Sequence, residues 1–120
     1  MRPPGRARPD VLAFDGPDGA MRTLLDGLRT LGFEIDEVHD LAGMRAAFFR
    51  SGGHRTLLLG PGLSPALAAR ASADLLAIDP ELRVLAFGEH PRGTLPAAVA
   101  RLQAHHPATR GALAAVLRWF

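Results

Sequence analysis

The segment Thr56–Gly60, TLLLG, decides how the rest of this chain is interpreted. A continuous apolar run of this kind is typical of a strand buried on both faces of a parallel sheet. The run stops at Gly60-Pro61-Gly62, which is a turn sequence. In proteins that alternate strands and helices, reactive side chains are often mounted where such a strand ends, and here that position holds glycine. The question is whether this loop cradles a ligand or belongs to a site that has lost its chemistry.

Segments with the spacing of strands and helices alternate on both sides of Thr56–Gly60. Further strands are predicted at Asp10–Phe14, Phe33–His39, Arg83–Gly88 and Arg101–Pro107. Helices are predicted between Met21 and Leu31 and over Leu41–Gly53, Ser64–Ile78, Thr94–Ala100 and Ala108–Phe120. Phe33–His39 alternates apolar and polar residues, as a half-buried edge strand does. Ser64 is the expected N-cap of its helix, with Pro65 in the first turn.

This alternation predicts an α/β fold. Strands joined through helices require right-handed crossovers and a parallel sheet that is covered on both faces. We therefore predict a flavodoxin-like (CheY-like) doubly wound sheet of five parallel strands over residues 10–120, preceded by a flexible Pro/Arg-rich leader, residues 1–9. The functional crevice of such a sheet lies at the carboxyl ends of its strands. Those ends are Asp15-Gly16, His39-Asp40, Gly60, Gly88-Glu89 and His106-Pro107.

Composition excludes several kinds of chemistry. The chain has no cysteine, so it forms no disulfide and offers no thiolate ligand or thiol nucleophile. All 14 basic residues are arginine. Three of them lie in the leader, which has no acidic residue. The rest of the chain has 11 arginines and 12 acidic residues, so it carries no excess of positive charge, and direct binding of nucleic acid by this domain is not expected. No signal peptide and no apolar run of about 20 residues is present, and we expect a cytoplasmic protein that does not insert into membranes.

Several phrases resemble the receiver domains of bacterial response regulators. The resemblance lies in VLAFDGPDGAMRTLLDGLRTLGFEIDEV, in TLLLG, in AIDPELRVLAFG and in the closing HP, and it extends over essentially everything after the leader. Receivers phosphorylate an aspartate after the third strand and hold Mg²⁺ with an acidic pair after the first. They place Ser or Thr after the fourth strand and a lysine before proline after the fifth. A hard divalent ion needs clustered carboxylates, and the phosphate needs a cation and a hydroxyl.

The resemblance implies that most of this pocket is degenerate here. Gly60 stands in the phospho-acceptor position, Gly16 in that of the second acid, Gly88 in that of the hydroxyl and His106 in that of the lysine, and Asp15 alone is retained. The sequence is therefore interpreted as a pseudo-receiver. The phrases LLLG, AFGEHP and HHPAT are similar to the atypical N-terminal receiver of FleQ-type enhancer-binding regulators of flagellar genes. We expect a non-enzymatic module without metal or cofactor, acting by protein contact or dimerisation in signalling or transcription control.

Other interpretations of the same residues stay open. Asp15 either caps the following turn or retains some metal affinity. Gly60-Pro61-Gly62 is either a tight turn or a phosphate-cradling loop, although the P-loop lysine and the full GxGxxG spacing are missing. His105-His106 is a poor metal pair because adjacent strand residues point to opposite faces. The alternative function is a small flavodoxin-like protein that binds a nucleotide or flavin in the strand-end crevice.

The closing helix is the expected interaction surface. Its apolar side carries Leu113, Val116 and Leu117, which leaves Arg110, Arg118 and Trp119 to reach outward. Tryptophan and arginine are enriched at interface hot spots, so we expect a homodimer or a protein partner on this face. The alternative is that Trp119 folds back onto Thr94–Ala100. The helix ends without a C-cap glycine or a polar tail, which favours the head of a longer regulator over a stand-alone domain, and both interpretations stay open.

Overall fold

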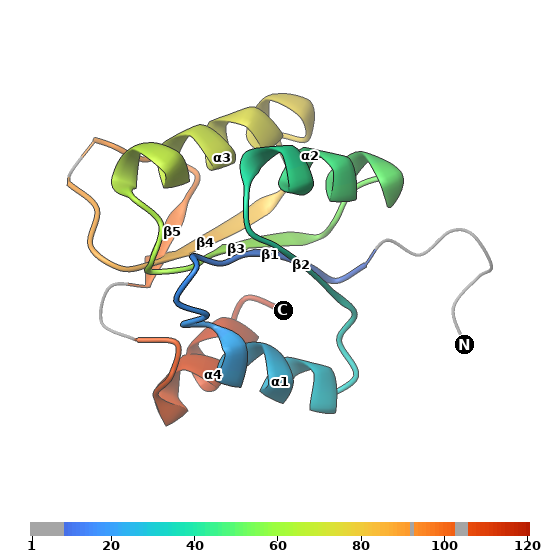
Figure 1. Cartoon of the computed structure of the whole chain (residues 1–120), viewed down its shortest axis with the longest axis vertical. Helices are drawn as coiled ribbons and strands as arrows, with labels where there is room; N and C mark the ends of the chain where they lie inside the picture. The colour runs from blue at the N-terminus through green and yellow to red at the C-terminus, as the bar shows by residue number, and fades with distance from the viewer. Residues whose placement is uncertain (1–8, 92, 103–105) are drawn as a thin grey trace.

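The protein is a five-stranded parallel sheet with helices on both faces, seen in a computed structural model that describes residues 9–91, 93–102 and 106–120 (Figure 1). The strands are β1 (Val11–Phe14), β2 (Ile35–Val38), β3 (Thr56–Leu59), β4 (Arg83–Phe87) and β5 (Ala100–Leu102). Their order in the sheet is β2-β1-β3-β4-β5, and every pairing is parallel. This is the doubly wound, flavodoxin-like arrangement that the sequence predicts.

Two pairs of helices enclose the sheet. The helices are α1 (Arg22–Thr30), α2 (Leu41–Arg50), α3 (Pro65–Ile78) and α4 (Arg110–Leu117). In Figure 1, α2 and α3 lie on one face of the sheet and α1 and α4 on the other. Among the described residues no helix is both long enough and apolar enough to span a bilayer.

The buried strands alternate their side chains between two separate cores. Leu57 and Leu59 of β3 belong to the core under α2 and α3, whereas Leu58 belongs to the core under α1 and α4. All residues of β1 and β3 are buried, as expected for the central strands of a sheet covered on both faces. β2 is only partly buried, which agrees with its predicted position at the sheet edge.

Short polar side chains cap the N-termini of α2 and α3, which begin where the sequence predicts helices. The Ser64 hydroxyl accepts a hydrogen bond from the Leu67 amide at 3.1 Å, and Pro65 opens α3. The Asp40 carboxylate accepts from the Gly43 amide at 2.6 Å and caps α2 in the same way. Each cap satisfies an amide that has no partner inside its helix.

The prediction of a helix over Thr94–Ala100 is wrong. The chain passes from β4 to β5 through turns, with the Thr94 amide bonded to the Pro91 carbonyl and the Val99 amide to that of Pro96. Pro96 lacks an amide hydrogen, and so short a segment would gain too few hydrogen bonds to offset helix nucleation. The described part of β5 covers Ala100–Leu102 and so starts one residue before its predicted start, and His106, predicted in this strand, lies in the turn region before α4.

Two other predicted features fall on residues that the structure does not describe. The leader lies outside the described residues except for Pro9, and His105 also lies outside them. The backbone of Arg110 begins α4, but its side chain is outside the description.

Candidate functional site at the carboxyl edge of the sheet

Asp15 lies buried at the carboxyl end of β1, where its side chain is fully engaged by the backbone. One carboxylate oxygen accepts from the Gly16 amide at 2.9 Å and the other from the Met21 amide at 3.0 Å. Met21 immediately precedes α1, so Asp15 ties the loop after β1 to the start of the helix. The side chain has no exposed surface. Of the two interpretations left open by the sequence, this geometry supports the cap.

The loop after β3 closes over Asp15. A Cβ atom added at Gly60 would lie 2.5 Å from Asp15 Oδ1, far inside the distance that real Cβ atoms keep. A Cβ atom at Gly16 would lie 2.9 Å from the carbonyl carbon of Gly62. At Gly62 a Cβ atom would meet Asp18 Oδ1 at 2.6 Å. These glycines let two backbone loops approach each other where larger side chains would hold them apart.

The end of β4 is closed by the same loop. Gly88 has φ of 94°, and a Cβ atom there would lie 3.2 Å from Pro61 Cα. A serine or threonine at this position would carry both the strain of positive φ and this close contact. Three adjacent strand ends, those of β1, β3 and β4, are thus packed together by Gly60-Pro61-Gly62. The segment acts as a tight packing turn, and no reactive side chain is mounted on it.

His106 is engaged within its own turn. Its Nδ1 accepts from the Ala108 amide at 3.1 Å, and its carbonyl accepts from the Thr109 hydroxyl at 2.8 Å. The residue is exposed, and these bonds hold the turn that leads into α4. Asp40 caps α2, and His39 Nδ1 lies 3.4 Å from the Asp15 carbonyl oxygen. Within the described ranges no group of three or more acidic or histidine side chains is placed to hold a metal ion.

Two of the three predicted interface residues lie just beyond the closing helix, because α4 ends at Leu117, earlier than the predicted end at Phe120. Arg118 is exposed and Trp119 is 41% exposed. Together with Leu102 and Ala115 they line a hollow of about 360 Å³ between β5 and α4. On the opposite side of the helix Val116 is fully buried, with Leu113 and Leu117 packed against the same core, as predicted.

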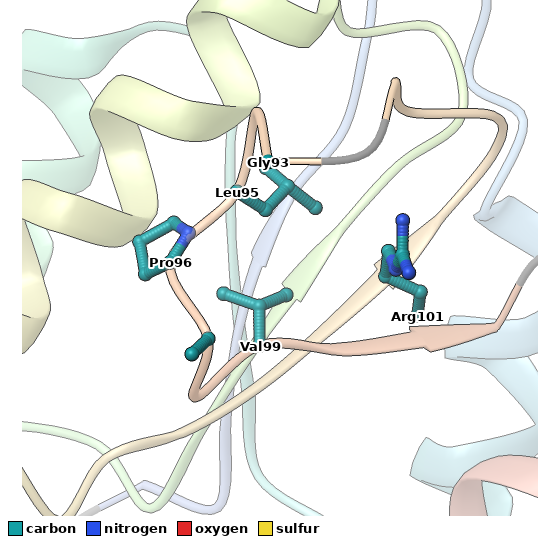
Figure 2. Close-up of a pocket in the computed structure, with 6 residues that line it drawn as sticks. Gly93, Leu95, Pro96, Val99 and Arg101 are labelled. Atoms are coloured by element: carbon teal, nitrogen blue, oxygen red, sulfur yellow. The ribbon is translucent and has the colours of Figure 1, made fainter.

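A second hollow lies where the sequence predicts a helix. Figure 2 shows a cavity between the β4–β5 loop and β5, lined by Gly93, Leu95, Pro96, Ala97, Val99 and Arg101. Its volume is about 300 Å³. Sequence reasoning missed it because a helix over Thr94–Ala100 would have covered this part of the sheet. Pro91, Gly93 and Pro96 are the local signal that could have indicated a loop.

No protein-family model matches this chain, and a search of curated proteins found no relative.

Proposed function

We propose that this chain is a receiver-like regulatory module that takes up no phosphate and acts through protein contacts, including contacts with a second copy of itself. The observation that carries the proposal is the packing of Gly60 against Asp15, in which backbone and carboxylate fill the place of an acceptor side chain. The resemblance to receivers supplies the setting, which is bacterial signalling or transcription control of the FleQ type. The fold agrees with that setting but is shared by proteins of many functions.

Phosphotransfer to this site lacks most of its chemical requirements. Asp15 is the only retained acid, it is fully buried, and each of its oxygens accepts a backbone hydrogen bond. The chain contains no lysine to neutralise a phosphate. The Gly88 position has no hydroxyl and no room for one without movement of Pro61.

The nucleotide- or flavin-binding alternative is less well supported. A phosphate at the loop after β1 would need free backbone amides, as in other anion-binding loops. The amides of Gly16 and Met21 already donate to Asp15, and those of Gly19 and Arg22 donate to carbonyls of the same loop. The absorbance spectrum of the purified protein separates the two proposals, since bound flavin absorbs in the visible.

The direct test is incubation with acetyl phosphate and Mg²⁺, followed by intact-mass measurement. We expect no phosphate adduct, and no change in the backbone amide spectrum on addition of beryllofluoride with Mg²⁺. A phosphorylatable receiver treated in the same buffer serves as the positive control. A stoichiometric, acid-labile adduct on this chain would overturn the proposal.

A further inference from the structure

The cavity beside β5 exists because the described residues between β4 and β5 form turns and no helix. Val99 directly precedes β5 and Arg101 lies within it, and Figure 2 shows both side chains directed toward the β4–β5 loop. Ala100 and Leu102 take the opposite side and pack with the core under α1 and α4. Leu95 turns back from the loop onto the core that contains Val99. The result is a hollow with aliphatic side chains and one guanidinium at its border.

Arg101 has no carboxylate partner within the described part of the chain. The arginines at positions 29 and 45 pair with Glu37 and Asp74, at 3.2 and 2.6 Å. Arg101 makes only a long contact, 3.5 Å, from Nη1 to the His90 carbonyl oxygen. A guanidinium presents parallel N–H groups that match the two oxygens of a carboxylate. Arg101 can therefore form a two-bond ion pair with a carboxylate, and no described carboxylate takes this place.

We propose that this cavity binds a small monocarboxylate with a short aliphatic body, for which isovalerate serves as the probe. The carboxylate would pair with Arg101, and the body would lie against Leu95, Pro96 and Val99. The volume of about 300 Å³ is at the lower end of small-molecule sites, which run from roughly 300 to 1,000 Å³. A volume this small suits a monocarboxylate better than a nucleotide, which needs more room. The proposal does not depend on the proposed regulatory function.

The test is a titration of the ¹⁵N-labelled protein with isovalerate, followed through its backbone amide spectrum. We expect saturable shifts confined to Gly93–Arg101 and the adjoining end of β4, with a dissociation constant on the order of 1 mM, as few contacts allow. Isovaleramide, which has the same shape without the charge, is expected to produce no saturable shifts.

Two variants make the test specific to Arg101. Arg101→Gln removes the charge from an exposed side chain and is expected to weaken isovalerate binding about tenfold or more. Arg50→Gln, at an exposed position on α2, is the matched control and should leave binding unchanged. Ala97→Glu places a carboxylate at the exposed rim of the cavity and is expected to compete with the ligand.

The outcomes separate this proposal from the absence of phosphotransfer. Shifts spread over many exposed arginines, equal binding of isovaleramide, or unchanged binding by a folded Arg101→Gln variant would each overturn it. The acetyl phosphate experiment has no bearing on this cavity. A titration without saturable shifts would also overturn the cavity proposal, and it would leave the proposed regulatory function as it stands.

Discussion

For a single residue, the chemistry that a side chain can perform depends on how the backbone surrounds it as well as on its residue type. Asp15 is the same residue type as the acid that receivers place after their first strand, and in this structure its oxygens accept from two backbone amides, those of Gly16 and Met21. A buried carboxylate held in this way stabilises the loop, because its loss would leave those amides without partners. Gly60 contributes by having no side chain at all, since its absence lets the loop close over Asp15.

Replacing Gly60 by Asp is expected to destabilise the protein without creating a phosphorylation site. Its Cβ would sit 2.5 Å from Asp15 Oδ1, so the loop must move, and two carboxylates would then share one small volume. We expect a loss of about 1–3 kcal/mol in the free energy of unfolding, measured by urea denaturation. Intact mass after acetyl phosphate treatment should show no adduct, because Gly88 and His106 provide neither hydroxyl nor ammonium group.

A double-mutant cycle tests the physical cause. Asp15→Ala alone should also destabilise, but Gly60→Asp should cost less in that background, since the clash and the charge repulsion are gone. Additive effects would show that the two residues do not interact as described. A phosphorylated Gly60→Asp variant with an altered oligomeric state would contradict the assignment of the pocket as degenerate.

At the scale of elements, local pattern identifies most of this fold. The apolar run of β3 and the helical spacing of α1 and α3 are strong enough to be interpreted from sequence, and each appears close to its predicted bounds. The segment Thr94–Ala100 is wrongly predicted as a helix because its alanines favour one. Pro96 and the short connection between β4 and β5 disfavour a helix there. The sequence shows that position 60, at the end of β3, carries no side chain. It does not show how Pro61 packs on Gly88, because that contact joins loops far apart in the chain.

The N-cap of α3 provides a test at this scale. Ser64→Ala removes the hydroxyl that accepts from the Leu67 amide, and we expect a loss of about 1 kcal/mol in the free energy of unfolding. Ser64→Gly is the matched control: it lacks the hydroxyl too, but glycine is tolerated at N-caps, so a loss of only a few tenths of a kcal/mol is expected. Urea denaturation measures both. Equal losses in the two variants would contradict a cap-specific contribution.

At the scale of the whole molecule, the two cores fill the space between sheet and helices and leave a few large apolar side chains outside. Phe49 on α2 and Ile78 at the end of α3 are exposed and lie on the face opposite α4. Trp119 and Phe120 are exposed at the end of the chain, where the Phe120 ring packs against Phe33 at a tilt of 53° with ring centroids 4.9 Å apart. Trp119 instead borders the hollow with Leu102 and Ala115, which gives this surface both an aromatic group and a depression.

We propose that this surface mediates self-association, and Trp119→Ala tests it. An exposed tryptophan beside an apolar hollow can pack into the corresponding hollow of a second copy, and truncating a central interface tryptophan costs on the order of 2 kcal/mol. That loss would weaken a micromolar dimer more than tenfold. Sedimentation of wild type and variant measures the change, with Phe49→Ala as the control, since Phe49 is 61% exposed on the other face of the sheet.

An unchanged dimer fraction in a folded Trp119→Ala protein would remove this surface from the proposal. A wild-type protein that stays monomeric at high concentration would remove self-association altogether, leaving contact with a different protein as the remaining way for the module to act.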